Sequence, residues 1–148
     1  MSKMFFEEID LDNLKLNINS LGLAEDRNKY SQDLQSYFNN YHKSFNDQQI
    51  NTIKNNPLRI LDSKDQKLTD IINGAPNISN YINKESLKKF NDMVQILDDL
   101  NIDYIINDKL VRGLDYYNDL VFEWKTDQLG TQDAICAGGR YDNLSNII

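Results

Sequence analysis

The chain has 148 residues and a net charge of −7 at pH 7, with a pI of about 4.6. It is long enough to form one domain with a real core. The acidic balance argues against a stand-alone nucleic-acid-binding module, because such modules usually carry a basic face. The single cysteine, Cys136, excludes an internal disulfide and fits a reducing compartment.

No apolar stretch approaches the length of a membrane span, so no membrane partner is expected. The first residues, Met1 to Phe6, lack the apolar core of a signal peptide. We therefore expect a cytoplasmic protein.

The first part of the chain predicts a strand followed by a long helix. Residues 3–11 suggest a short helix end, and residues 14–20 alternate strictly between apolar and polar, which predicts a half-buried strand. Residues 23–44 carry apolar side chains at steps of three and four, which predicts a helix with one apolar stripe. The stripe consists of Leu23, Tyr30, Leu34, Tyr37, Phe38, Tyr41 and Phe45. We interpret it as a core face and not as a base-stacking surface.

Three further helices are predicted in the middle of the chain. They cover residues 47–54, 64–73 and 84–100, and Asn83 is the expected cap of the last one. Residues 58–61 are expected to form a brief extended or turn segment.

The pattern then changes to the period of two that is typical of strands. Residues 102–106, 119–126 and 134–137 predict three strands, which would join residues 14–20 in an antiparallel sheet. A block of about four helices would interrupt this sheet between its first and second strands. The fold class expected is α+β.

The highest concentration of site chemistry lies after the helices. Residues 110–117 read Leu-Val-Arg-Gly-Leu-Asp-Tyr-Tyr, and Val121-Phe122-Glu123 and residues 137–144, Ala-Gly-Gly-Arg-Tyr-Asp-Asn-Leu, follow. Arginine binds phosphate and carboxylate through its planar fork. Tyrosine offers a ring face and a hydroxyl, and glycine lets a ligand approach the backbone. Together these residues indicate a site for a small, polar, anionic substrate.

These segments resemble the bacterial histidyl-tRNA synthetases, a class II aminoacyl-tRNA synthetase family. Residues 110–123 and 137–144 look like the two histidine-specific signatures of that family. Upstream, residues 19–22, Asn-Ser-Leu-Gly, and 56–64, Asn-Pro-Leu-Arg-Ile-Leu-Asp-Ser-Lys, are also similar to bacterial members. The resemblance therefore covers nearly the whole chain in the right order.

The resemblance implies an internal fragment of the catalytic domain. A class II antiparallel sheet would be interrupted by a mostly helical insertion domain. Residues 1–21 and 104–148 would belong to the catalytic domain, and residues 22–103 would be the insertion. The family's dimer motif, its other ATP-binding motifs and its anticodon-binding domain have no counterpart here, so we expect the isolated chain to be inactive.

The same resemblance implies an activity and its partners. The full-length enzyme would activate L-histidine with ATP and Mg²⁺ as substrate, form histidyl-adenylate and transfer histidine to tRNA(His). It would be a homodimer and would have no tightly bound cofactor.

Arg112 is the candidate catalytic residue. In adenylation the histidine carboxylate attacks the α-phosphorus of ATP, and negative charge grows on the α-phosphate oxygens. A fixed guanidinium at Arg112 would stabilise this transition state more than the ground state. On residue type alone, an arginine before a glycine is usually a surface loop residue, and the resemblance reverses that expectation.

The resemblance also implies a histidine pocket built from Tyr116, Tyr117, Gly138, Gly139 and Tyr141. In an extended stretch the two adjacent tyrosines point to opposite faces, so both need not contact the ligand. The glycine pair would let the substrate lie against the strand, and the alternative for it is a bulge or tight turn.

Several charged residues admit two interpretations. Glu123 either orients a neighbour or is structural, and Arg140 either lines the pocket or pairs with Asp142. Arg59 and Lys64 are possible tRNA phosphate contacts, and salt bridges to nearby aspartates are at least as good an explanation.

No metal site is expected, because the chain has one histidine, His42, and one cysteine. Two rival functions stay open. One is a catalytically silent synthetase paralogue that senses histidine, such as the regulatory subunit of ATP phosphoribosyltransferase. The other is a tRNA-binding module centred on the helical insertion.

Overall fold

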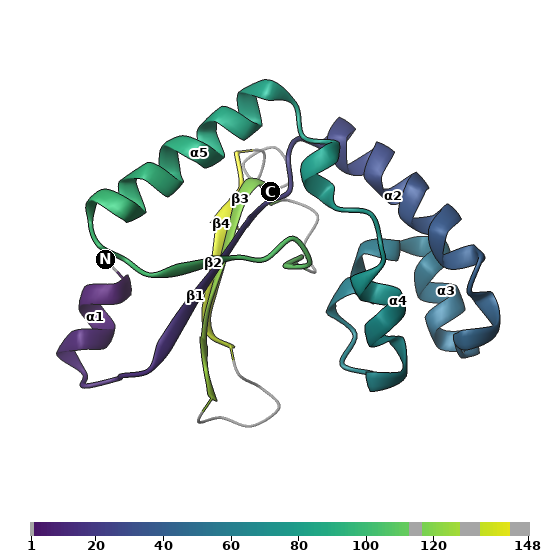
Figure 1. Ribbon diagram of the computed structural model, residues 1–148, viewed down its shortest axis with the longest axis horizontal. Coiled ribbons are helices and arrows are strands. Elements are labelled where there is room, and N and C mark those ends of the chain that lie inside the picture. Colours follow the sequence, from purple (N-terminus) through teal and green to yellow (C-terminus); the bar gives the residue numbers. More distant parts are fainter. Residues whose placement is uncertain (1, 113–116, 128–133, 143–148) are drawn as a thin grey trace.

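The computed structural model describes residues 2–112, 117–127 and 134–142 (Figure 1). Within these ranges lie five α-helices and four strands. The helices are α1 (Ser2–Glu8), α2 (Ala24–Asn39), α3 (Asp47–Asn55), α4 (Thr69–Asn73) and α5 (Lys84–Asp99). The strands are β1 (Leu14–Ser20), β2 (Tyr104–Ile106), β3 (Asn118–Thr126) and β4 (Ala134–Arg140). The α+β fold class predicted from the sequence is confirmed.

The strands form one sheet with the order β2-β1-β3-β4. β3 pairs antiparallel with both β1 and β4, whereas β2 pairs parallel with β1. The expectation of a wholly antiparallel sheet was therefore wrong at β2. A parallel pair needs a long crossover connection, and the helices α2 to α5 between β1 and β2 provide one.

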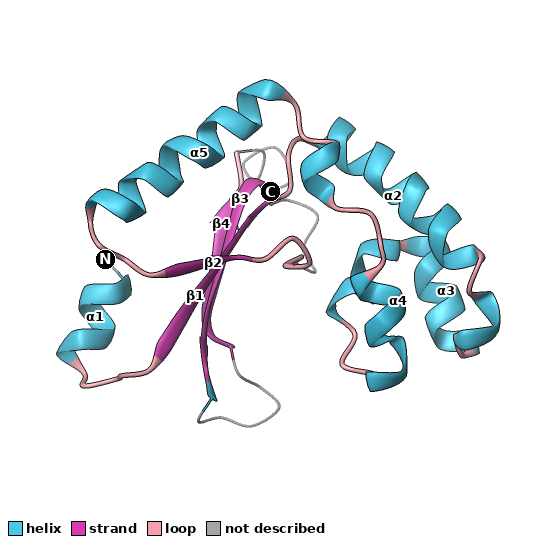
Figure 2. Cartoon of the chain, in the orientation of Figure 1, coloured by secondary structure: helices cyan, strands magenta, loops and turns pink. Residues whose placement is uncertain are grey.

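The two faces of the sheet are covered by different helices (Figure 2). Seen edge-on, the sheet has α1 and α5 on one side and α2, α3 and α4 on the other. On the first side, Phe6 of α1 and Phe90 of α5 pack against Leu16, Ile18 and Trp124 of the sheet. The opposite face carries polar side chains, and this is the face that looks toward α2, α3 and α4.

The insertion helices α2, α3 and α4 share a second core. Tyr30, Leu34 and Phe38 of α2 are completely buried in it, which confirms the middle of the predicted stripe as a core face. Its members Leu23 and Tyr41 are exposed, so for these two the prediction was wrong. α2 ends at Asn39, earlier than predicted, because the chain turns there and Phe45 returns to pack edge-on against Phe38 with ring centroids 5.7 Å apart.

Two segments of the insertion differ from the predicted elements. Residues Pro57–Asp62 form a 3-10 helix and not an extended segment, with the proline at its start, where its missing N–H costs nothing. The helix predicted over 64–73 is split into a 3-10 turn, Gln66–Leu68, and the short α4. Asp65 caps this turn by accepting from the Lys67 N–H at 3.0 Å.

α5 differs from the other insertion helices in its contacts. It begins where predicted, with Asn83 as its N-cap accepting from the N–H groups of Glu85 and Ser86, both at 3.0 Å. Its apolar face packs on the sheet and not on α2, α3 and α4. The boundary at residue 103 stays a prediction, and within residues 22–103 two separate packing units are present.

Where the sheet meets the insertion helices, two backbone hydrogen bonds join the chain after β1 to Asp119 of β3. The Leu21 N–H donates to the Asp119 carbonyl at 2.6 Å, and the Asp119 N–H donates to the Gly22 carbonyl at 2.9 Å. Asp119 has a φ of 52°, a left-handed conformation that aspartate tolerates better than most residues. The end of β1 is thereby fixed to the start of β3.

Polar side chains surround these backbone hydrogen bonds, and we call Asp26, Asn83, Ser86, Lys89 and Asp119 the junction cluster. Asp26, Ser86 and Asp119 are buried, while Asn83 and Lys89 are partly exposed. The Asn83 amide donates to the Asp26 carboxylate at 2.7 Å and to the Ser86 hydroxyl at 3.2 Å. The Ser86 hydroxyl donates in turn to Asp119, and Lys89 lies 3.4 Å from the same carboxylate. The cluster joins the starts of α2, α5 and β3.

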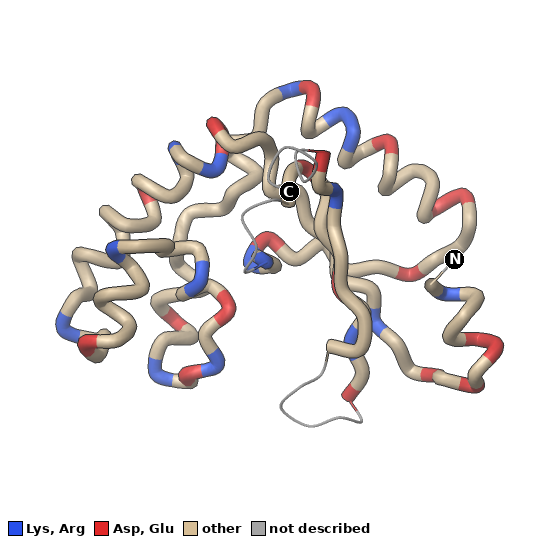
Figure 3. Tube along the Cα trace, turned by 180° about the vertical axis from the view of Figure 1, so that it is seen from behind, with Lys and Arg blue, Asp and Glu red and all other residues tan. Residues whose placement is uncertain are grey.

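Charges of both signs occur along α5 and along the insertion helices (Figure 3), and on α5 the lysines lie in its first half. None of the helices in the described part of the chain is both long enough and apolar enough to cross a bilayer.

Asn83→Ala should lower the free energy of unfolding by about 2 kcal/mol or more, because the chain loses a helix cap and leaves the buried Asp26 carboxylate short of a donor. The matched control is Asn46→Ala, which removes the exposed N-cap of α3 and should cost about 1 kcal/mol. Urea unfolding measures both values. Equal losses in the two variants would contradict a special role for the junction cluster.

Candidate functional site

The candidate site is built on the segment that follows β2, residues 107–112, which we call the site loop. In Figure 1 it runs from β2 into the space between the sheet and the insertion helices. Its start is fixed to β1, since the Asn107 N–H donates to the Ile18 carbonyl at 2.9 Å. The buried Asn19 side chain donates to the Leu110 carbonyl at 3.0 Å. The site loop is thus hydrogen-bonded to the sheet at two points.

The site loop is also attached to the insertion. The Lys109 ammonium donates to the Ala75 carbonyl at 2.8 Å and to the Asn77 side chain at 3.1 Å. Burial lowers the pKa of Lys109 from its ordinary value. Leu110 and Val111 are buried in the core of the insertion helices. The position of the next residue, Arg112, therefore depends on both the sheet and the insertion.

Arg112 makes an ion pair with Glu123 of β3, with 3.3 Å between Nη1 and Oε1. The other carboxylate oxygen of Glu123 lies 3.2 Å from the Lys125 ammonium. The Nε atom of Arg112 is buried and has no hydrogen-bond partner among the described residues. Glu123 therefore contacts two cations, and the choice between an orienting and a structural role, which the sequence left open, stays a prediction.

Two cavities adjoin Arg112. The first, of about 200 Å³, lies between Arg112 and Tyr117 and the insertion, and none of the described residues that line it carries a carboxylate. Its other lining residues are Leu21, Arg27, Asn28, Ser31, Asn55, Asn56 and Leu58. The second, of about 270 Å³, is lined by Arg59, Asp62, Val111 and Arg112. The structure thus places the predicted tRNA contact Arg59 beside the predicted catalytic arginine.

Tyr117, Gly139 and Tyr141 lie together at the ends of β3 and β4. The Tyr117 and Tyr141 rings meet edge to face with centroids 6.0 Å apart. A Cβ atom at Gly139 would lie 2.7 Å from the Tyr117 ring and 2.7 Å from the Leu120 carbonyl oxygen. Gly139 therefore makes room for the Tyr117 ring, and the pairing of β3 with β4 shifts register beside it, between Asn118 and Val121.

Gly138 has a different environment from Gly139. A Cβ atom there would meet the Phe122 ring at 2.8 Å, and Phe122 belongs to the core under α1 and α5. Adjacent residues of a strand face opposite sides of the sheet. Of the two glycines predicted to bind histidine, only Gly139 has its open side toward Tyr117.

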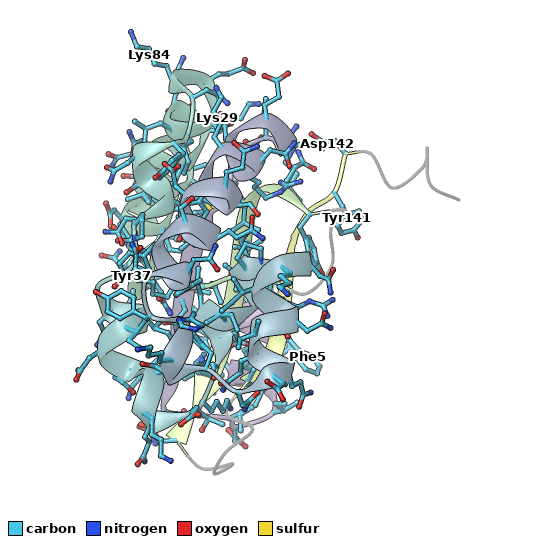
Figure 4. All side chains as sticks on the ribbon, turned by 90° about the vertical axis from the view of Figure 1, so that its right-hand side faces the viewer. Phe5, Lys29, Tyr37, Lys84, Tyr141 and Asp142 are labelled. Carbon is cyan, nitrogen blue, oxygen red and sulfur yellow. The ribbon has the colours of Figure 1, made fainter. Side chains whose placement is uncertain are left out.

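The turn after β4 is fixed by a charged pair and an amide. Arg140 Nε donates to Asp142 at 2.8 Å, and the Asn118 side chain accepts from the Asp142 N–H at 2.9 Å. The Arg140 guanidinium, followed by the Asn118 amide, holds the pKa of the Asp142 carboxyl below its ordinary value. Figure 4 shows Tyr141 and Asp142 at the end of β4.

Two predicted site residues remain, Lys64 and Tyr116. Lys64 is exposed on the insertion after the 3-10 helix, while Tyr116 lies outside the described residues. Within the described ranges, no group of three or more histidine, cysteine, aspartate or glutamate side chains is arranged to hold a metal ion.

Sequence reasoning missed Lys109, Asn19 and Lys125. Lys109 attaches the site loop to the insertion, Asn19 attaches it to β1, and Lys125 contacts the carboxylate that pairs with Arg112. For Lys125 a signal was present, because it alternates with Glu123 along a predicted strand and so shares its face. Lys109 and Asn19 act through long-range contacts that no local pattern indicates.

The comparisons with known proteins support the resemblance found in the sequence. No family model matches the chain. It is 49% identical over 139 residues to a histidine--tRNA ligase of Vesicomyosocius okutanii, which covers 94% of this chain and 33% of the relative. A histidine--tRNA ligase of Francisella philomiragia is 46% identical over 140 residues, covering 94% of this chain and 33% of the relative.

A solved structure agrees with these relatives. The apo histidyl-tRNA synthetase of Staphylococcus aureus superposes with a TM-score of 0.68 and 31% identity, covering 95% of this chain and 34% of that one. The fold is therefore that of a class II synthetase. Over nearly its whole length, this chain is a homologue of the histidine--tRNA ligases, and it spans about a third of the length of the curated relatives it matches.

A second solved structure shares the fold. It is described as an ATP phosphoribosyltransferase regulatory subunit/histidyl-tRNA synthetase from Bacillus halodurans, with a TM-score of 0.53 and 19% identity. It covers 98% of this chain and 41% of that one.

Gly139→Ala should lower the free energy of unfolding by about 1 to 3 kcal/mol, because the new methyl group collides with a backbone carbonyl and with the Tyr117 ring. Gly138→Ala is the matched control on the adjacent residue and should cost less, since only the edge of the Phe122 ring has to move. Urea unfolding of the two variants tests this difference. An equal or smaller loss for Gly139→Ala would contradict the close packing of Tyr117 on β4.

Proposed function

We propose that this chain is part of a histidine–tRNA ligase and contributes to the activation of histidine by ATP. One observation carries the proposal: Arg112 is held by Glu123 next to Tyr117, in a chain 49% identical to such a ligase. L-histidine, Mg²⁺-ATP and tRNA(His) would be the substrates. A homodimer and a cytoplasmic location are part of the same proposal.

Arg112 would act on the α-phosphate of ATP. The attack of the histidine carboxylate places negative charge on the α-phosphate oxygens and releases pyrophosphate. A guanidinium fixed before the reaction stabilises that charge without reorganising. The ion pair with Glu123 and the burial of Leu110 and Val111 support such a fixed position. Mg²⁺ bound to ATP would supply additional charge neutralisation.

Tyr117 and Tyr141 would form part of the histidine pocket, with Gly139 as the space that lets Tyr117 lie on β4. A neutral imidazole has one donor and one acceptor nitrogen, and a tyrosine hydroxyl can serve either. A pocket that satisfies both nitrogens rejects isosteres that lack them. Tyr116 and Gly138 stay predictions for the same pocket.

Histidine-dependent ATP–pyrophosphate exchange tests the assignment of Arg112. A hybrid ligase carries residues 1–148 of this chain in place of the matching third of the Vesicomyosocius enzyme. Arg112→Ala in this hybrid should reduce exchange by about a hundredfold or more, as expected for the loss of a transition-state charge contact. The fold should persist, as judged by circular dichroism.

The control for this experiment is Lys88→Ala, which removes one exposed positive charge from α5 and should leave exchange unchanged. Exchange at the unsubstituted rate in Arg112→Ala would show that Arg112 is not catalytic. We expect no exchange from the 148-residue chain alone, because the family's other ATP-binding motifs are not part of it.

A histidine-sensing paralogue without catalysis is the alternative, and its support is the fold shared with the Bacillus halodurans protein. The 49% identity with a ligase favours the enzyme. The hybrid separates the two, because a sensing protein would bind histidine without promoting exchange.

Arg59 and Lys64 would contact phosphates of tRNA(His) in the full-length enzyme. Loss of one phosphate contact should weaken tRNA binding and reduce the slope of log affinity against log salt by about 1. A gel shift over a series of salt concentrations measures this for Arg59→Ala and Lys64→Ala in the hybrid. Lys67→Ala, an exposed lysine nearby, is the control, and slopes equal to that control would contradict the contact.

A further inference from the structure

We propose that Glu123 is the positioning residue for Arg112, and that its carboxylate sets the direction in which the guanidinium points. The inference rests on the proposed adenylation function. It assigns a role in the reaction to a strand residue that need not touch the substrate itself. Three features of the structure support it. They are the pairing of β3 on both sides, the two cations on the Glu123 carboxylate, and the single ion pair that Arg112 makes within the described residues.

The rigidity comes from the position of Glu123 in the sheet. β3 is paired on both sides, with Asn17 of β1 and Ala137 of β4 opposite Glu123. The Glu123 side chain is only 10% exposed. Arg112, by contrast, lies in the site loop, outside any strand or helix. The carboxylate therefore provides a fixed reference point for a side chain that its own backbone does not hold in a regular element.

The charge distribution explains how Arg112 can be held and still bind an anion. A carboxylate paired with one arginine would neutralise it and compete with a phosphate for its N–H groups. Here the second carboxylate oxygen is 3.2 Å from the Lys125 ammonium. Two cations share the Glu123 carboxylate, so this anion is not committed to Arg112 alone.

Within the described residues, the Arg112 guanidinium makes one ion pair, the one with Glu123. Arg112 Nη1 reaches Glu123, while Nε is buried and has no partner there. Removing the charge of Glu123 would therefore take away the one ion pair that orients the group. Asp62 shares the second cavity with Arg112, but no ion pair between them is found within the described residues, where Glu123 is the carboxylate that reaches the guanidinium.

The kinetic experiment is Glu123→Gln in the hybrid ligase. This substitution keeps the shape of the side chain and removes its charge. We expect the kcat of pyrophosphate exchange to fall about ten- to a hundredfold, as misplacement of a catalytic group does, with KM for ATP and for histidine nearly unchanged. The matched control is Glu85→Gln, which breaks the exposed ion pair between Glu85 and Lys89 and should leave kcat unchanged.

A double-mutant comparison separates positioning from a structural effect. If Glu123 acts through Arg112, then Glu123→Gln should cause no further loss once Arg112→Ala is present. An equal further loss in that background would overturn the inference, and so would an unchanged kcat in Glu123→Gln. If the unsubstituted hybrid shows no exchange, the proposed function fails, and the inference is decided by the next measurement.

That measurement needs no activity and uses the 148-residue chain. In ¹⁵N spectra of the arginine side chains, the buried Nε–H of Arg112 should give a well-ordered signal, identified by its loss in Arg112→Ala. Glu123→Gln should lower the order parameter of that signal, and Glu85→Gln should not. An Arg112 signal that is equally ordered with and without the Glu123 charge would overturn the positioning role.

Discussion

The buried carboxylate of Asp119 is the point on which the arrangement of the two packing units depends. Its backbone exchanges hydrogen bonds with Leu21 and Gly22 at the end of β1, and its side chain accepts from Ser86 of α5. A buried carboxylate is costly unless it is hydrogen-bonded and paired, and Lys89 supplies the charge. These requirements fix where α5 starts, and the long connection can then return to the sheet so that β2 pairs parallel with β1.

The site follows from this geometry because the site loop is held by both units. The sheet fixes its start, and the insertion holds Lys109, Leu110 and Val111. Arg112 is therefore placed where two separately packed bodies meet, and the insertion lines part of both cavities beside it. The position of a substrate bound at Arg112 would therefore depend on the insertion as well as on the sheet.

Much of the fold could be predicted from local patterns. The alternation of residues 14–20, the stripe of Tyr30, Leu34 and Phe38 and the cap at Asn83 each indicated the element that forms. The parallel pairing of β2 could not be predicted in this way, because it depends on where the connection of residues 21–103 returns and not on the three residues of the strand. The early end of α2 was missed for a similar reason, since Phe45 reaches the core through a turn.

The sequence indicated which residues belong to the candidate site better than it indicated how they are arranged. Arg112, Tyr117, Gly139 and Tyr141 carried a motif, and the structure brings them near one another. The different surroundings of Gly138 and the two cations on Glu123 depend on strand register, which sequence alone leaves open. Register decides which side chain shares a face with which partner.

A crystal structure of the hybrid ligase with a non-hydrolysable histidyl-adenylate analogue would show whether Arg112 is the group that meets the α-phosphate. We expect its guanidinium within hydrogen-bond distance of the phosphate-mimicking oxygens, still paired with Glu123, and the imidazole of the analogue beside Tyr117. An analogue bound with its phosphate mimic away from Arg112, or an Arg112 turned away from both Glu123 and the ligand, would contradict the assignment of this arginine.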